Sequence, residues 1–479
     1  MAEAAKKKKT LWNFVDTLEG DKVVWMIVIL LIMVSILAIF SSTSQLALMD
    51  GTSRMAIVRE QMALAVVGLG LIIGCCAIPK IGIFRILSQF GYIASIIPLL
   101  ILLIASAVCG KSGKTSLDMG FITAQNINSA WRIIKVFGVQ FHVYEFVKVA
   151  MIMYLSWAVN AYNNDSFTIA NHLAKKYPIW KKPLTKKIAY IYFPIFSTCL
   201  CMMTGSLSSP VFIGGIMMAT ILVGGIKIRE LLPVIGVAAV LLLGCIGINA
   251  FSKKKLFSHL DSALGRITDG TGKKMARLEE YTPNSKEFDE ILGSLKQPIG
   301  AKVAIKEGKF LGKGAGKSTQ RYVIPIVFDD YMFSFIVEEY GWLGGMILMS
   351  FYISLLARGS IIARNCDNQF AKTAVAGLVL LISGQALLHI VINCDMGPLT
   401  GQTLPMVSHG NSSFLMFSLA FGIILSISKM AKRKIEREAA REDPLVDRRI
   451  KDEVRSGIED LEQMENDIPD YGIDDHNNE

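Results

Sequence analysis

The chain has 479 residues, of which 52% are hydrophobic and 19% are charged, and its mean hydropathy is +0.44. Soluble domains rarely have this composition, and runs of about 20 apolar residues are the signature of membrane-spanning helices. The net charge of +10 arises mostly from Lys and Arg in short loops, which indicates membrane topology and attraction to anionic lipid rather than to nucleic acid.

The apolar runs predict an all-α polytopic membrane protein with about ten transmembrane helices. The expected spans are 23–42, 56–78, 83–108, 142–160, 188–204, 208–226, 230–250, 331–356, 373–393 and 412–428. They form one membrane domain over 23–430, with a large extracytoplasmic loop at 252–329 between helices 7 and 8. We expect a cytoplasmic or interfacial segment at 1–22 and a charged, largely disordered cytoplasmic tail at 431–479.

Lys and Arg are concentrated in alternate short loops, notably at 175–187 and 429–434. Because positive loops stay inside, both termini are expected in the cytoplasm and the 252–329 loop on the outer, periplasmic side of the inner membrane. The eight cysteines show neither CxxC nor Cys/His ligand spacing. They are expected to be small apolar residues of helices, and no metal site is predicted from them.

A glycine-rich segment at 308–318 is reminiscent of a nucleotide-binding loop, but Gly312 and Gly316 are separated by three residues where a Walker loop needs four. Two readings remain. It is either a cationic turn, with Lys313 and Arg321, whose amides approach a phosphate, or an ordinary solvated loop.

Two acidic pairs follow, Asp329–Asp330 and Glu338–Glu339. Carboxylates beside a bilayer are costly, so they normally have a function. A helix start needs only one capping acid, so we expect one aspartate to cap and the other to face a cavity. Glu338 lies about two turns further along and is either an ion-pair member or a proton-transfer group.

Glu145 and Lys148 stand three residues apart in the fourth expected span, so they share a helix face. They form either an intrahelical ion pair or the charged wall of an interior cavity. Arg132, in the preceding outer loop, is suited to bidentate contact with a phosphate. The hydroxyl-rich segment 400–413 is expected to line a cavity, with His409 as a hydrogen-bonded surface histidine.

In this order, the motifs resemble the SEDS family of bacterial cell-wall synthesis proteins, which includes FtsW, RodA and SpoVE. Gly312 to Arg321 is similar to the family's GKGxGNSxQK, and 328–345 to its HTDFIFAVxxEExGxxGG. Segment 400–413 resembles TGxxLPxxSYGGSS, while Glu145 and Lys148 match QPSExxK. The residues in these motifs most resemble those of the division branch, FtsW, as it appears in Bacteroidota.

The resemblance implies an inverting glycosyltransferase that polymerises lipid II into glycan strands at the outer membrane face during cell division or cell-shape maintenance. It implies a class B penicillin-binding protein (a transpeptidase) and other divisome proteins as partners. Aligning the motifs makes Asp330 the catalytic residue. The implied substrate-binding residues are Arg132, Glu145, Lys148, Lys313, Ser318, Arg321 and Ser412. A divalent cation, Mg²⁺ or Mn²⁺, would help to neutralise phosphate charge.

The chain departs from the family where Phe328 and Asp329 replace His and Thr, and where the segment around Ser206 lacks an acidic residue. Two other functions therefore remain open: a transporter or flippase of lipid-linked precursors, and a catalytically weak scaffold for a class B transpeptidase. Glycan synthesis from fluorescent lipid II in detergent separates an enzyme from a transporter, because detergent solution has no second compartment.

Overall fold

The computed structural model describes residues 19–44, 51, 53–78, 80–109, 115–127, 130–137, 139–203, 205–206, 208–251, 271–280, 285–324, 326–397, 400–442 and 456. The expected interfacial segment therefore lies outside the described residues up to position 18, and the expected tail does so from 443 onward apart from Ser456. The chain divides into two units, Met1–Lys429 and Met430–Glu479, and all side-chain contacts below belong to the first.

The first half of the chain contains helices that precede and follow a short sheet in the sequence. They are α2 (Lys22–Ser42), α4 (Arg54–Ala77), α5 (Ile81–Gln89), α6 (Gly91–Cys109), α7 (Val143–Asn163), α8 (Thr168–Lys176), η1 (Pro178–Lys181), α9 (Pro183–Lys187), η2 (Ile188–Tyr192), α10 (Phe193–Met202), α11 (Ser208–Val223) and α12 (Ile228–Phe251). Side-chain caps fix several starts: Asp21 accepts from the amide of Val23 at 3.0 Å at the start of α2.

The second half contains α14 (Thr271–Glu280), α15 (Lys286–Gly308), η3 (Gln320–Tyr322), α16 (Val327–Asp330), α17 (Met332–Arg364), α18 (Gln369–Asn393) and α19 (Asn411–Glu442). Each expected span overlaps a helix of the structure. Within the described residues, six helical stretches are long and apolar enough to cross a membrane, whereas α11 is shorter. A multi-pass helical membrane protein is thereby confirmed.

A four-stranded antiparallel sheet corrects the all-α expectation. Its strands β1 (Ser116–Asp118), β2 (Ile122–Ile127), β3 (Ala130–Val136) and β4 (Val139–His142) pair in chain order. Trp131 and Ile133 are buried, and β4 runs directly into α7. The sheet therefore sits at one end of α7 and places β3 beside the charged residues of that helix.

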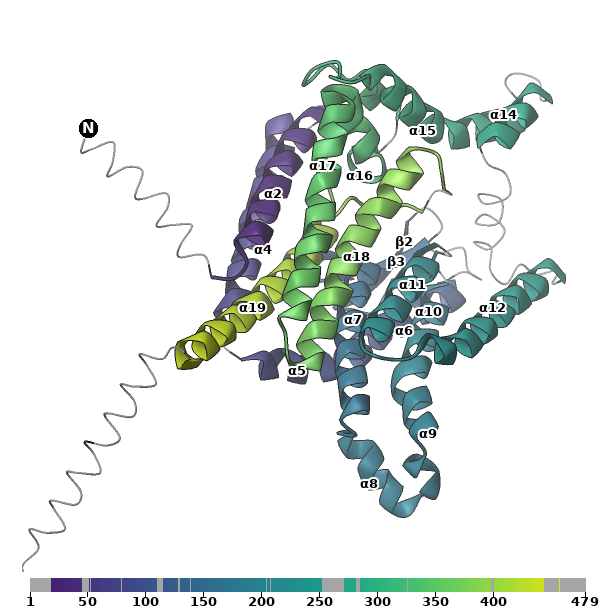
Figure 1. Cartoon of the computed structure of the whole chain (residues 1–479). Helices are drawn as coiled ribbons and strands as arrows, with labels where there is room; N and C mark the ends of the chain where they lie inside the picture. The colour runs from purple at the N-terminus through teal and green to yellow at the C-terminus, as the bar shows by residue number, and fades with distance from the viewer. Residues whose placement is uncertain are drawn as a thin grey trace, which may run out of the picture. The chain divides into compact units, whose positions relative to one another are not determined.

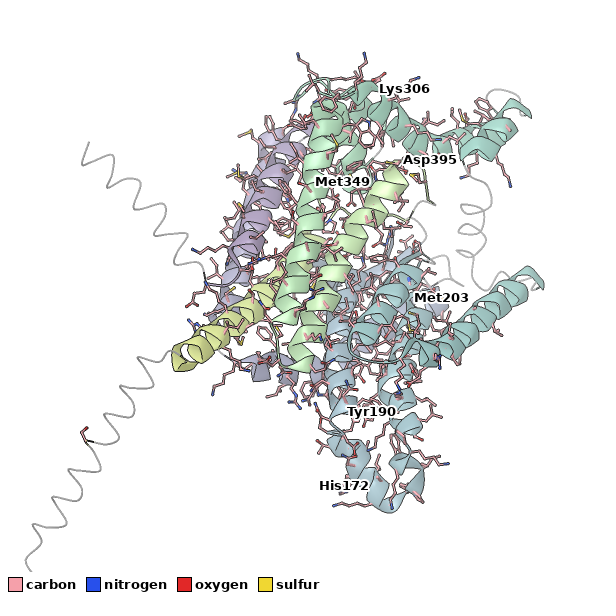
Figure 2. All side chains as sticks on the ribbon, viewed as in Figure 1. His172, Tyr190, Met203, Lys306, Met349 and Asp395 are labelled. Carbon is pink, nitrogen blue, oxygen red and sulfur yellow. The ribbon has the colours of Figure 1, made fainter. Side chains whose placement is uncertain are left out.

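Helices α7 and α18 form the centre of the first unit. Most of their side chains are buried, whereas α4 exposes Val66 and Val67, as a lipid-facing helix does. Figure 1 shows α17 and α18 side by side, in agreement with their packing. Figure 2 places Lys306 of α15 at one end of this unit and His172 of α8 at the other.

The loop expected at 252–329 contains the helices α14, α15 and α16 in its described part. An ion pair between Lys302 and Asp395 joins α15 to the end of α18. The following helix, α17, is broken at Gly341, where φ is 70° and ψ is −177°. Only glycine adopts this conformation without steric cost, so the residue divides α17 into two arms.

Candidate functional site

Asp329 and Asp330 are the last two residues of the short helix α16, rather than the first residues of α17. The N-cap of α17 is Tyr331, which makes no side-chain capping hydrogen bond. The expectation that one aspartate caps the eighth span was therefore wrong. The chain turns between the two helices at Tyr331, so neither aspartate is the N-cap of α17.

The backbone of this acidic turn is held from two sides. Ser408 donates its hydroxyl to the carbonyl of Asp329 at 2.7 Å, and the amide of His409 donates to the carbonyl of Phe328 at 2.9 Å. From α18, Asn393 Nδ2 donates to the carbonyl of Asp330 at 3.1 Å. These bonds hold the backbone that carries the Asp330 side chain, and a fixed backbone restricts where its carboxylate can lie.

Arg132 and Asp330 meet at Gly401. A Cβ atom built on this glycine would lie 3.8 Å from Asp330 Oδ1 and 3.9 Å from Arg132 Nη1. Gly401 has a φ of +62° and is exposed, so the absence of a side chain leaves accessible space next to both charged groups. The structure thus brings together two of the residues selected from the sequence, one from β3 and one from α16.

Several polar atoms around this point are buried without a hydrogen-bond partner among the described residues. They are Arg132 Nε, Asp329 Oδ1, Thr400 Oγ1 and His409 Nδ1. Buried polar atoms in native structures are nearly always paired, and exceptions commonly mark sites that receive a ligand or water. Three donors or potential donors and a carboxyl oxygen therefore lack partners within the described part of the chain, and a polar ligand could supply them.

The neighbouring carboxyl groups of Asp329 and Asp330 influence each other's ionisation. Burial, followed by the neighbouring charge of Asp330, raises the pKa of Asp329 well above its ordinary value, while Arg132 partly opposes this. Burial also lowers the pKa of His409, whose ring packs edge-on against Phe328 at 5.8 Å between centroids. His409 is therefore a packed histidine whose Nδ1 is buried without a partner among the described residues, so the expectation of a hydrogen-bonded surface histidine was wrong.

Glu145 and Lys148 form the predicted intrahelical ion pair, at 2.8 Å. Lys148 also donates to Gln385 Oε1 at 2.8 Å and to Gln402 Oε1 at 2.7 Å, and only 1% of it is exposed. A lysine ammonium has three donors, and all three are used. Lys148 thus holds Gln402, the residue next to Gly401, and has no further donor for a substrate.

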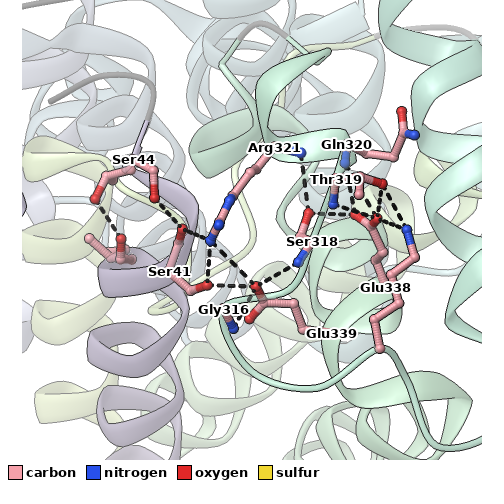
Figure 3. Close-up of polar contacts among 12 residues, drawn as sticks. Ser41, Ser44, Gly316, Ser318, Thr319, Gln320, Arg321, Glu338 and Glu339 are labelled. Atoms are coloured by element: carbon pink, nitrogen blue, oxygen red, sulfur yellow. Dashed lines mark hydrogen bonds and ion pairs between the residues drawn. The ribbon is translucent and has the colours of Figure 1, made fainter. Parts of the chain in front are cut away.

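The glycine-rich loop makes contacts that the sequence did not predict (Figure 3). Lys313 Nζ lies 2.7 Å from Glu338 Oε1, and the amide of Thr319 donates to the same oxygen at 2.9 Å. Gly316 donates its amide to Glu339 Oε1 at 3.0 Å. These loop amides therefore donate to protein carboxylates in this structure, and their approach to a phosphate stays a prediction.

Further contacts complete this cluster, which we call the Glu338–Glu339 cluster. Ser318 donates its hydroxyl to Glu338, and Arg321 Nη1 donates to the carbonyl of Ser41 at 3.2 Å while lying 4.0 Å from Glu339. Burial lowers the pKa of Lys313, but its hydrogen bonds to Glu307 and Glu338 outweigh this and hold that pKa above its ordinary value. These cations are engaged by protein carboxylates and carbonyls.

The same loop packs directly on the break in α17. A Cβ atom at Gly308 would lie 2.1 Å from the carbonyl oxygen of Val337, and one at Gly341 would lie 2.1 Å from that of Phe310. Trp342 donates its amide to the carbonyl of Lys309 at 2.9 Å. Gly308 and Gly341 therefore allow two backbones to touch, which explains these two glycines without a nucleotide.

Ser412 joins the sheet to α19. Its hydroxyl accepts from the amide of His142 at 3.1 Å and donates to the carbonyl of Gln140 at 3.4 Å. The residues missed by the sequence analysis are Gly401 and the buried polar residues of α18, Gln385, His389 and Asn393. Polar side chains at a four-residue spacing in an apolar span were a visible signal, because they share one helix face.

Within the described residues, no group of three or more His, Cys, Asp or Glu side chains is placed to hold a metal ion. Mg²⁺, however, is commonly bound by one or two carboxylates together with substrate phosphates. Asp329 and Asp330 are compatible with that arrangement once a phosphate is present.

Comparison with known proteins gives a consistent result. Residues 21–433 match the sequence model of the FtsW/RodA/SpoVE family, described as cell cycle proteins. A probable peptidoglycan glycosyltransferase FtsW of Caulobacter vibrioides is 34% identical over 26% of this chain and 32% of its own length, so the match spans about a third of that relative.

Two solved structures show the same fold. One, titled "Structural coordination of polymerization and crosslinking by a peptidoglycan synthase complex", has a TM-score of 0.58 and 19% identity, covering 86% of this chain and 98% of the other. The other, Thermus thermophilus rod shape determining protein RodA, has a TM-score of 0.51 and 17% identity, with the same coverage.

Proposed function

The chain belongs to the family of cell cycle proteins that includes FtsW, RodA and SpoVE, and we propose that it is an inverting peptidoglycan glycosyltransferase that polymerises lipid II. One observation carries the proposal: a carboxylate, Asp330, and a guanidinium, Arg132, face the same side-chain-free position at Gly401. An inverting displacement needs a base on the attacking side and positive charge on the leaving side.

In the proposed reaction, Asp330 takes the proton from a sugar hydroxyl as its oxygen bonds to the anomeric carbon of a second lipid-linked saccharide. The bond from that carbon to the pyrophosphate breaks, and the lipid pyrophosphate leaves with the electron pair. Arg132, whose Nε has no partner among the described residues, stabilises the charge on the leaving group. The proton stays on Asp330 until it is released to solvent.

The other predicted substrate residues receive different roles in this proposal. Glu145 and Lys148 hold the segment around Gln402, and Ser412 joins the sheet to α19. Lys313, Ser318 and Arg321 hold the glycine-rich loop against α17 and α2. They therefore act on the reaction through the shape of the site, and direct phosphate contact is assigned to Arg132.

A divalent cation, Mg²⁺ or Mn²⁺, would supply further neutralisation of the pyrophosphate when bound with it. Asp329 is the described residue best placed to help hold such an ion, because its buried Oδ1 has no hydrogen-bond partner among the described residues. Activity measured against added EDTA and then added Mg²⁺ tests the requirement.

The proposal includes ten spans, cytoplasmic termini and a periplasmic site in the inner membrane, supported by the Lys and Arg distribution. It also includes a septal role during cell division, supported by the relative named FtsW. A class B penicillin-binding protein is the proposed partner, supported by the fold shared with a chain of a peptidoglycan synthase complex. Other divisome proteins would join the same assembly.

Two other functions make different predictions. The interior pair Glu145–Lys148 would also serve a transporter or flippase of lipid-linked precursors, and Phe328 and Asp329 in place of His and Thr would suit a weakly catalytic scaffold. Fluorescent lipid II in detergent distinguishes them. Glycan chains made by the purified protein support the enzyme, whereas their absence with and without the transpeptidase favours one of the alternatives.

Asp330→Asn tests the proposal directly. Base catalysis contributes about 10²–10⁴-fold, so the purified variant should lose glycan polymerisation by at least the lower of these factors while its melting temperature stays unchanged. Asp118→Asn is a matched control, because Asp118 is an exposed acid that accepts hydrogen bonds from the nearby Gly120 and Thr123. Full activity of Asp330→Asn would refute the assignment.

A further inference from the structure

Three polar residues of α18, Gln385, His389 and Asn393, are spaced four apart and share one helix face. Their exposed fractions are 0%, 1% and 0%. We call them the α18 polar stripe. Interhelical hydrogen bonds within a membrane contribute little to stability on average, so apolar packing would serve stability equally well. A buried polar stripe with every member bonded is better explained by the geometry that it imposes.

His389 joins two walls of the site. Its Nε2 accepts from the backbone amide of Phe333 at 3.3 Å, so Nδ1 carries the proton and donates to the carbonyl of Gln402 at 2.7 Å. Phe333 is three residues after Asp330, and Gln402 is next to Gly401. A single imidazole therefore spans from the start of α17 to the segment that faces Asp330 and Arg132.

Asn393 lies one turn further along α18. Its Oδ1 accepts from the amide of Ser334 at 2.9 Å, and its Nδ2 donates to the carbonyl of Asp330 at 3.1 Å. The first amides of a helix have no partner within that helix, and Tyr331 provides no side-chain cap for α17. His389 and Asn393 thus cap α17 from another helix and hold the turn that carries Asp330.

Gln385 completes the stripe on the opposite side of the site. Its Oε1 accepts from Lys148 at 2.8 Å, and its Nε2 donates to the carbonyl of Thr403 at 3.0 Å. Gln402 is bound in turn by Lys148 at 2.7 Å and donates to Ser209 at 3.1 Å. Apart from a bond within α18 from Asn393 Nδ2 to the carbonyl of His389 at 2.8 Å, the side-chain contacts described for the stripe reach the turn at 330–334, the segment at 402–403 or Lys148.

From these contacts we infer that His389 and Asn393 are positioning residues that set the separation between the Asp330 carboxylate and the Gly401–Arg132 side of the site. The inference rests on the proposed glycosyltransferase function. Neither side chain needs to touch the substrate. Each acts through the backbone it holds, so its loss should slow the chemical step more than it weakens substrate binding.

Replacing His389 by Leu removes both bonds of the imidazole. Since displacement by about 1 Å can cost about 10²-fold, we expect kcat for lipid II polymerisation to fall about 10–100-fold, with KM within about twofold of the parent protein. His389→Asn keeps a donor near the Nδ1 position and should recover part of the loss. Rates are normalised to folded protein, measured by circular dichroism and by elution as a single species.

Thr373→Val is the matched control. Thr373 is also a fully buried polar residue of α18, but its hydroxyl has no hydrogen-bond partner among the described residues. This isosteric change should leave both kcat and KM unaltered. If Leu at 389 prevents folding, His389→Asn and His389→Gln replace it, because each amide keeps one of the two bonds and should lower kcat about 3–10-fold.

An unchanged kcat per folded molecule in the His389 variants would overturn the inference, as would a change confined to KM, or a His389→Asn variant no better than His389→Leu. The proposed function is judged separately by Asp330→Asn. If Asp330→Asn is inactive while the His389 variants match the parent, only the positioning role fails. If Asp330→Asn is active, the proposed function fails.

Discussion

Two groups of acids on either side of the α17 start differ in how their charges are satisfied. Glu338 and Glu339 accept hydrogen bonds from the glycine-rich loop, from Lys313 and from Ser41, and their exposed fraction is 0%. Both oxygens of Glu338 accept hydrogen bonds, whereas Glu339 Oε2 and Arg321 Nε are buried without partners among the described residues. Around Asp330, by contrast with Glu338, Arg132 Nε and Asp329 Oδ1 are buried and lack partners among the described residues. The two groups lie within one short stretch of sequence.

This difference distinguishes residues that stabilise the fold from residues that can take part in the reaction. Carboxylates surrounded by donors hold the backbone in place, because a buried charge is tolerated when it is paired and hydrogen-bonded. Polar atoms left without partners gain them when a ligand arrives, so they can stabilise charge that develops during a reaction. The mutations below are expected to divide along this line.

After Asp330→Asn, replacement of Arg132 should give the largest effect on activity. Removing one preorganised donor to a developing charge commonly costs about 10²–10³-fold, so Arg132→Ala should lower kcat/KM by that factor. Arg132→Lys keeps the positive charge but loses the planar, bidentate geometry of the guanidinium. Its kcat/KM should lie between that of the parent protein and that of Arg132→Ala. Polymerisation of purified lipid II measures both variants.

Lys135→Ala serves as the control for Arg132, since Lys135 is a cation of the same strand in its regularly paired part, whereas Arg132 stands at the irregularity between Trp131 and Ile133. Its activity should match that of the parent protein. Equal losses for Arg132→Ala and Lys135→Ala would mean that the sheet, rather than the guanidinium, matters.

Glu338→Gln should instead affect stability. It places a neutral amide among donors that now bind a carboxylate, and hydrogen bonds to charged groups contribute about 1.5–3 kcal/mol each. We expect a lower melting temperature in detergent, with turnover per folded molecule within about twofold of the parent.

Glu307→Gln is the comparison for Glu338→Gln, because Glu307 contacts the same Lys313 but its side chain is 42% exposed. Exposed ion pairs contribute about 0–1 kcal/mol, so the shift in melting temperature should be small. If Glu307→Gln destabilises as strongly as Glu338→Gln, the distinction between the two carboxylates is wrong.

Gly401→Ala should produce a smaller, local effect. The left-handed backbone there costs an L-residue about 1–2 kcal/mol, and the new methyl group would lie 3.8 Å from Asp330 Oδ1. Because that methyl occupies the space between Asp330 and Arg132, kcat/KM should fall more than the stability loss explains. Gly410→Ala, at a glycine without positive φ, should leave kcat/KM unchanged.

Asp329→Asn should produce the smallest effect, on the pH dependence of stability. A folded pKa above the ordinary value of 3.8 means that Asp329 contributes stability below that pH, which is lost as the pH rises and the buried carboxyl must ionise. Asp329→Asn should therefore melt higher than the parent at pH 7, and the difference should disappear near pH 3.8. A variant that melts lower at pH 7 would contradict the raised pKa.

The sequence predicted the helices because apolar length is a strong local signal, and it predicted the Glu145–Lys148 pair because a three-residue spacing fixes a shared face. It did not predict the sheet at 116–142, because its short strands lie within a connection between helices. The branched residues Ile122, Ile133 and Ile134 were the available signal there.

The site was predictable only in part, for a physical reason. Asp330 and Arg132 were selected by residue type and by resemblance, but their meeting at Gly401 depends on tertiary contacts. Lys313 and Arg321 were assigned to phosphate because cations beside glycines favour anions. Their actual partners include Glu338 for Lys313 and Ser41 for Arg321. Ser41 is 280 residues from Arg321 in the sequence, a pairing that no local pattern reveals.

The most direct test of the central claim compares Asp330→Asn with Glu338→Gln in one purified polymerisation assay, with each rate expressed per folded molecule. We expect Asp330→Asn to melt like the parent protein and to make no glycan, whereas Glu338→Gln should melt lower and its folded fraction should still polymerise lipid II. Glycan synthesis by Asp330→Asn, or a fully folded but inactive Glu338→Gln, would contradict that claim.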